Sequence, residues 1–124
     1  MNETEFQQGV AAARDVYPET RLLPFQGSGR PVRVAPVPIP AKFWGGGTTR
    51  LIVVFDLANH DNAKPRGLLG PEWKLPGGGA PHNASPVFEF GEAWQGFSWN
   101  FPWPPALGVV ETIEAYVGRL SDCR

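Results

Sequence analysis

The sequence contains a single cysteine and no long hydrophobic run. Because Cys123 is the only thiol among 124 residues, the chain cannot form an internal disulfide bond. No apolar stretch approaches the roughly 20 residues that a membrane-spanning helix needs. The opening sequence MNETEFQQGV has neither the basic start nor the apolar core of a secretory signal peptide. These absences predict a cytoplasmic protein without a membrane partner.

An excess of charge of either sign is also missing. The 11 basic and 12 acidic residues give a formal net charge of -1, whereas nucleic-acid binding requires clustered positive charge. We therefore expect no nucleic-acid partner. Cys123 lies next to the C-terminus with no histidine near it in the sequence, and we interpret it as a tolerated exposed thiol.

Glycine and proline, by contrast, are abundant. The chain has 15 glycines and 14 prolines, yet 42% of its residues are hydrophobic. This combination predicts long, shaped loops around a packed core rather than disorder. A chain of this length buries roughly two-thirds of its unfolded surface on folding, so we expect a single domain over residues 1–124.

The pattern along the chain predicts an α+β fold. An N-terminal helix is expected over residues 3–17, because Asn2 and Glu5 can form a capping box at its start. An antiparallel meander sheet should follow, with a further short strand later in the chain; the expected strands are 21–26, 32–39, 49–57 and 87–90. Residues 58–85 are rich in proline and glycine and predict a long irregular segment.

A C-terminal helix is expected to open directly after Pro104 and Pro105. Proline suits the first helical position because its φ angle is already helical. Apolar residues then recur at steps of three and four, which is the spacing of one helix face: Leu107, Val110, Ile113, Val117 and Leu120.

Two short motifs lie in the second half of the chain. Trp103 leads through two prolines and an alanine to Leu107, and Pro81 precedes the pair His82-Asn83. Together with the order of elements, these motifs resemble the ubiquitin-conjugating enzyme family. In that family a His-Pro-Asn motif precedes the catalytic cysteine, and a tryptophan and a proline-alanine pair lead into a helix. The resemblance implies a fold in which a helix is followed by a meander sheet. It also implies a protein partner, which would be a ubiquitin-like protein or an activating or conjugating protein.

The catalytic cysteine of that family has no counterpart here. It would fall within residues 87–94, which read VFEFGEAW and contain no cysteine, serine or threonine. Transfer of a ubiquitin-like protein requires a thiolate, which is the group that forms the thioester. The resemblance therefore implies a cysteine-less variant, comparable to the inactive adaptor members of the family and to relatives in bacterial ubiquitin-like systems. Such a variant would bind its partner without catalysis and without a cofactor.

Large aromatic side chains are concentrated between Trp94 and Trp103. We interpret most of them as core residues beneath the long loops. Tryptophan is nevertheless favoured at interfaces, because it combines a large apolar area with a polar N–H group. The residues that we assign to a binding surface are Trp73, Trp94, Phe97, Trp99, Phe101 and Trp103.

Other functions remain open at this point. His60, Asp61 and His82 carry metal-capable side chains, which would suit a small metal-dependent hydrolase. Their spacing matches no closed zinc motif, and solvated turn residues explain them more simply. Glu89 and Glu92 would suit the paired carboxylates of a glycosidase, although a surface position is the plainer account. A third interpretation is a phage- or toxin-associated structural or immunity protein whose aromatic loop covers a partner.

Overall fold

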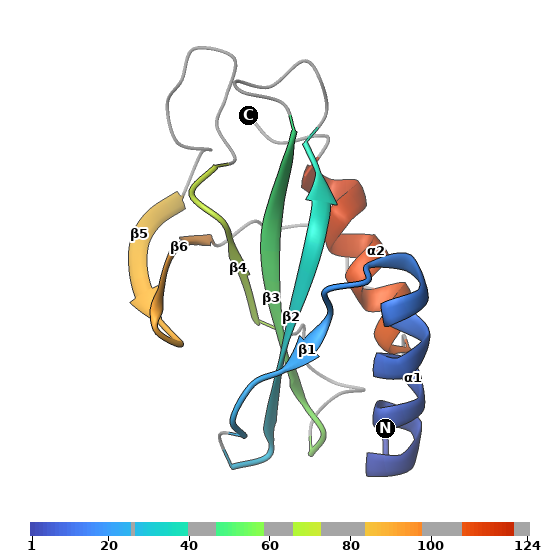
Figure 1. Ribbon diagram of the computed structural model, residues 1–124. Helices are drawn as coiled ribbons and strands as arrows, with labels where there is room; N and C mark the ends of the chain where they lie inside the picture. The colour runs from blue at the N-terminus through green and yellow to red at the C-terminus, as the bar shows by residue number, and fades with distance from the viewer. Residues whose placement is uncertain (26, 40–46, 59–65, 73–83, 98–107, 121–124) are drawn as a thin grey trace.

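The computed structural model describes residues 1–25, 27–39, 47–58, 66–72, 84–97 and 108–120. Within these ranges the chain forms a six-stranded antiparallel sheet, preceded in the sequence by one helix and followed by another. This arrangement confirms the predicted α+β class (Figure 1). The elements are α1 (Glu3–Val16), β1 (Arg21–Leu22), β2 (Gly29–Pro38), β3 (Thr48–Asp56), β4 (Arg66–Leu69), β5 (Ala84–Glu89), β6 (Glu92–Phe97) and α2 (Val109–Leu120). Neither helix, as described, is long and apolar enough to cross a membrane.

Helix α1 starts where the sequence predicts. The Asn2 side chain accepts the backbone N–H of Glu5 at 2.8 Å, and the Glu5 carboxylate accepts the backbone N–H of Asn2 at 3.4 Å. This capping box satisfies two N–H groups that the first turn would otherwise leave unpaired. The buried face of α1 consists of Phe6, Val10 and Ala13.

The sheet has the strand order β1-β2-β3-β4-β6-β5. Strands β1 to β4 form the expected meander, but β6 rather than β5 pairs with β4, at Leu68↔Gly96 and Leu69↔Gln95. Strand β5 is therefore an edge strand. Strand β4 lies inside the segment 58–85, which the sequence predicts to be irregular. The sequence does not indicate this strand because its four residues lie beside glycine and proline and carry too little pattern. Residues 59–65 and 73–83 of that segment lie outside the described residues.

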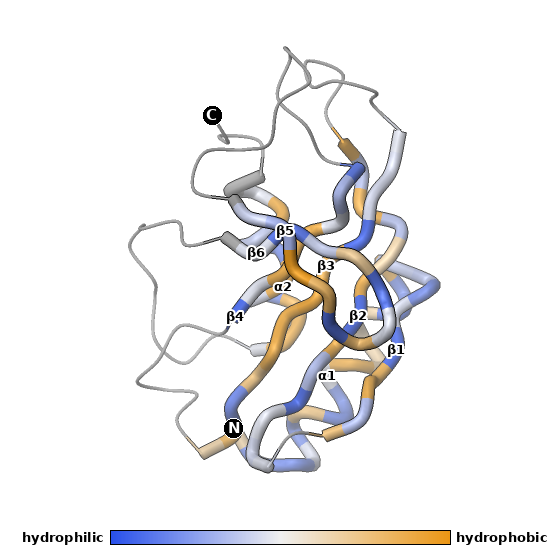
Figure 2. Tube along the Cα trace, turned by 90° about the vertical axis from the view of Figure 1, so that its left-hand side faces the viewer, coloured by the Kyte–Doolittle hydropathy of each residue, from blue (hydrophilic) through white to orange (hydrophobic). Residues whose placement is uncertain are grey.

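Both helices cover the same face of the sheet (Figure 1). Phe6 and Val10 of α1 pack with Val53 and Phe55 of β3 in the main core, and α2 adds Ile113. Figure 2 is turned by 90° so that the left-hand side of Figure 1, away from the helices, faces the viewer, and there β5 and β6 lie in front of β3. The apolar centre of β3 is thus covered on both faces, as its continuous hydrophobic run predicts.

Helix α2 begins later than the sequence predicts. It starts at Val109, and the Thr112 backbone N–H donates to the Gly108 carbonyl at 2.9 Å. The expected start at Pro104 and Pro105 lies outside the described residues. The buried face is centred on Val109, Ile113 and Tyr116, whereas Val110 and Val117 of the predicted stripe are only partly buried.

Candidate functional site

The hairpin formed by β5 and β6 covers the sheet face that the helices leave open. Its anchor is Trp94, which is 1% exposed and packs with Ile52 of β3 and Leu68 of β4 in a second, smaller core. The indole N–H of Trp94 donates to the Glu89 carbonyl within the hairpin at 3.0 Å. Trp94, assigned above to a binding surface, is therefore first of all a core residue.

The turn at the tip of the hairpin packs against the sheet through Phe90. Phe90 and Gly91 both have positive φ angles, 54° and 76°, as in a two-residue type I′ turn. Phenylalanine is an unusual residue here, because the left-handed conformation costs roughly 1–2 kcal/mol for a side chain with a Cβ atom. The Phe90 side chain packs against the second core, and this burial offsets the backbone cost.

Arginines from two neighbouring strands hold the start of β6. Arg33 of β2 donates from Nε to Glu92 Oε2 at 3.0 Å and from Nη2 to Glu92 Oε1 at 3.2 Å. Arg50 of β3 donates from Nη2 to the Ala93 carbonyl at 2.6 Å, and its guanidinium lies 4.7 Å from the centre of the Trp94 ring. We call Arg33, Arg50 and Glu92 the hairpin clamp.

A further ion pair fixes the other strand of the hairpin. Arg66 of β4 contacts Glu89, the last residue of β5, with an Nη1–Oε1 distance of 3.3 Å. Glu92 has a pKa below its ordinary value, chiefly because Arg33 donates a hydrogen bond to its carboxylate, helped by the charges of Arg33, Arg50 and Arg21. A glycosidase acid needs a raised pKa, so the clamp does not favour the carboxylate-pair interpretation.

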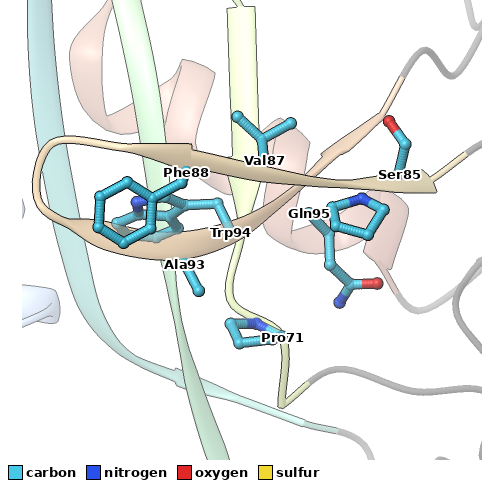
Figure 3. A pocket seen from close by; sticks show the side chains of 8 residues that line it. Pro71, Ser85, Val87, Phe88, Ala93, Trp94 and Gln95 are labelled. Carbon is cyan, nitrogen blue, oxygen red and sulfur yellow. The ribbon is translucent and has the colours of Figure 1, made fainter.

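The hairpin and the end of β4 border an apolar cavity of about 520 Å³, which we call the hairpin groove (Figure 3). Because side chains alternate along a strand, Phe88 and its cross-strand partner Ala93 lie on the hairpin face opposite to Trp94. Phe88 is 75% exposed. The lining residues are Pro71, Ser85, Pro86, Val87, Phe88, Ala93, Trp94 and Gln95.

The polar side chains of the groove are few. The Gln95 amide donates to the Gly70 carbonyl at 2.9 Å, and this bond fixes its orientation. Ser85 contributes a hydroxyl on an exposed residue. The described lining therefore offers an apolar surface with little hydrogen-bonding capacity, and its volume lies within the range of about 300–1,000 Å³ typical of ligand sites.

The edge of the hairpin is protected against further strand pairing. A two-residue turn makes Glu89 and Glu92 a hydrogen-bonded pair, so the backbone groups of Val87 also point towards β6. The backbone of Pro86 then points away from β6, and proline has no N–H to offer at that position. An incoming strand cannot complete a regular ladder along β5.

Most residues that the sequence analysis assigned to a site lie outside the described part of the chain. These are Trp73, Trp99, Phe101 and Trp103 of the binding surface, His82 and Asn83 of the motif, and His60 and Asp61 of the metal alternative. Phe97 ends β6, and its side chain is not described.

The groove residue Phe88 was not assigned from the sequence. A signal was present in the run Val87-Phe88-Glu89, because alternation in a strand places Phe88 on the face opposite to Val87. Residues 87–94, where the resembling family has its cysteine, form the centre of the hairpin itself.

Comparison with known proteins adds no further assignment: the chain matches no family model, no curated protein and no solved structure. The site is therefore interpreted from its own geometry.

Proposed function

We propose that this chain is a non-catalytic protein-binding adaptor that docks its partner in the hairpin groove. The observation that carries the proposal is Phe88, a large apolar side chain that is 75% exposed beside an apolar cavity. Ligand and partner pockets are lined mainly by hydrophobic and aromatic side chains, and Phe88 with the adjoining cavity has this composition. Phe88 belongs to a hairpin that Trp94 and the clamp hold in place, so it is presented on a firm support.

The chemistry of the groove supports binding over catalysis. Its described lining includes no histidine, cysteine, lysine or carboxylate, and Ser85 has no general base beside it among these lining residues. Acyl transfer or hydrolysis needs a nucleophile within hydrogen-bond reach of a base. An apolar surface instead stabilises a complex by burying the side chains of a partner.

A ubiquitin-like protein, or an activating or conjugating protein, is the first class of partner to test. The helix followed by a meander of β1 to β4 is the order that the ubiquitin-conjugating family has, and this supports the choice. The partner would contact the hairpin by side-chain packing. Strand addition is disfavoured because Pro86 interrupts the outer edge of β5.

The test is calorimetric titration of candidate partners into the wild-type chain and two variants. Phe88→Ala should weaken binding about tenfold or more, because a large aromatic at the centre of an interface is the usual hot spot. Phe25→Ala is the matched control, since Phe25 is 50% exposed on the β1–β2 connection and does not line the groove. Equal affinities for wild type and Phe88→Ala, or the absence of binding to every candidate, would refute the proposal.

A further inference from the structure

We infer that the β5–β6 hairpin is a latch, which opens as one unit while the two helices and strands β2 and β3 stay folded. All the lining residues of the hairpin groove except Pro71 belong to this hairpin. Opening moves them away from Pro71 and uncovers Ile52 and Leu68, which are buried in the closed state. The groove therefore exists only while the latch is closed.

A short backbone ladder joins the hairpin to the rest of the sheet. In the described part of the chain, β6 pairs with β4 at Leu68↔Gly96 and Leu69↔Gln95, and β5 pairs with no strand except β6. Strands β2 and β3, by contrast, pair over most of their ten and nine residues. Because an isolated two-stranded hairpin is at best marginally stable in water, separation from β4 also releases the ladder between β5 and β6.

The apolar support of the hairpin is small and separate from the main core. Its buried members are Ile52, Leu68 and Trp94, of which the hairpin supplies Trp94, and the partly buried Phe90 packs against them. The main core has fifteen buried residues among those that the structure describes. Since the free energy of burial scales with the apolar area removed from water, detachment of the hairpin costs less than unfolding of the chain. Units with few buried contacts open more often than the core.

Ion pairs supply a further part of the attachment. Glu92 lies 3.0 Å from Arg33 Nε and 3.6 Å from Arg50 Nε, and Glu89 pairs with Arg66. The two carboxylate side chains are 30% and 32% exposed, so water competes for them and each pair contributes modestly. Arg50 Nε is buried without a hydrogen-bond partner, which is a cost of the closed state that opening relieves by admitting water.

Native-state hydrogen exchange of the isotope-labelled chain, measured by NMR, tests the latch. Where exchange follows the opening equilibrium, the cross-strand amides of β5 and β6 should share one opening constant, at least about tenfold larger than that of the slowest amides of β2 and β3. Low concentrations of urea should affect the hairpin amides less steeply, because opening of the hairpin exposes less surface than unfolding of the chain.

Gly118→Ala separates opening of the hairpin from unfolding of the chain. No atom lies within 4 Å of the added Cβ, and alanine stabilises α2, which stays formed when the latch opens. Exchange in β2 and β3 should therefore slow by up to about fivefold, whereas exchange in β5 and β6 should not change. If the hairpin opened only when the whole chain unfolds, the substitution would slow all four strands equally.

Glu92→Gln weakens the closed latch directly. It should accelerate exchange along both β5 and β6 by about twofold to fivefold, because the pairs with Arg33 and Arg50 lose their charge. Glu3→Gln is the matched control, since it removes an ion pair with Arg30, 3.3 Å long, that lies between α1 and β2. Its hairpin amides should exchange at the wild-type rate.

Three results would overturn the latch. They are a common opening constant for the hairpin and for β2 and β3, equal slowing of all four strands by Gly118→Ala, and hairpin exchange that Glu92→Gln leaves at the wild-type rate. Because these measurements use the free chain, they do not depend on the proposed function. A hairpin that opens in a chain without any binding partner contradicts only the adaptor function, whereas partner binding through Phe88 with no separate opening contradicts only the latch.

Discussion

Arg33 and Glu92 join the second strand of the sheet to the hairpin through two hydrogen bonds, 3.0 and 3.2 Å long. The two residues are separated by 59 positions in the chain. All the lining residues of the groove except Pro71 belong to this hairpin. The bidentate contact therefore sets the position of the groove relative to the sheet.

Glu92→Gln should lower the free energy of unfolding by roughly 1 kcal/mol at about pH 7, because it removes the charge that both arginines hold. The pKa of Glu92 is lowered in the folded state, so its contribution is complete above the ordinary value of 4.5 and disappears as the pH falls through the lower, folded value. Urea unfolding of wild type and variant should thus differ near neutral pH and converge in acid. A difference between wild type and Glu92→Gln that persists unchanged into acid would contradict this role of the carboxylate.

Gly9→Ala should destabilise the chain by about 1–3 kcal/mol, although alanine is the better helix former. A Cβ atom at Gly9 would lie 2.6 Å from Val109 Cβ, where α1 and α2 approach each other. Gly118→Ala is the matched control, since no atom lies within 4 Å of its added Cβ, and it should stabilise by up to about 1 kcal/mol. If Gly9→Ala also stabilises in thermal unfolding, the packing of the two helices is wrong.

The two tyrosines of the chain should both resist ionisation in the folded state. Burial, then the charge and hydrogen bond of Glu114, raise the pKa of Tyr17 from 10.0 to about 12, and burial raises that of Tyr116. The contribution of these tyrosines to the free energy of unfolding is fully present below the unfolded pKa, and it is lost as the pH rises from 10 towards 12. Phenolate absorbance should therefore appear only above pH 10, whereas denaturant should return its midpoint to about 10. Tyr17→Phe isolates the signal of Tyr116, and a native midpoint near 10 would contradict the packing.

The parts of the fold that local chemistry determines could be predicted from the sequence. The capping box of Asn2 and Glu5 depends on two residues three positions apart, and the continuous apolar run of β3 indicates cover on both faces. The strand order could not be predicted. Pairing of β6 with β4 depends on contacts between Leu68 and Gly96 that no local pattern records.

The position of the Trp94 side chain could not be predicted from the sequence. Trp94 is assigned to a binding surface on its composition, yet it faces Ile52 and Leu68 rather than solvent. Register decides this: Trp94 opposes Val87, and both lie on the face away from Phe88. Composition favoured tryptophan as the contact residue, whereas the turn at Phe90-Gly91 fixed which aromatic is exposed.

The most direct test of the central claim is amide NMR of the isotope-labelled chain with each candidate ubiquitin-like, activating or conjugating protein added in turn. If the hairpin groove is the docking surface, the partner that binds will shift the resonances of Phe88, Ala93 and the Gln95 side-chain amide most strongly. Perturbations confined to α1, α2 or the β1–β2 connection would contradict the claim, as would a spectrum that no candidate changes.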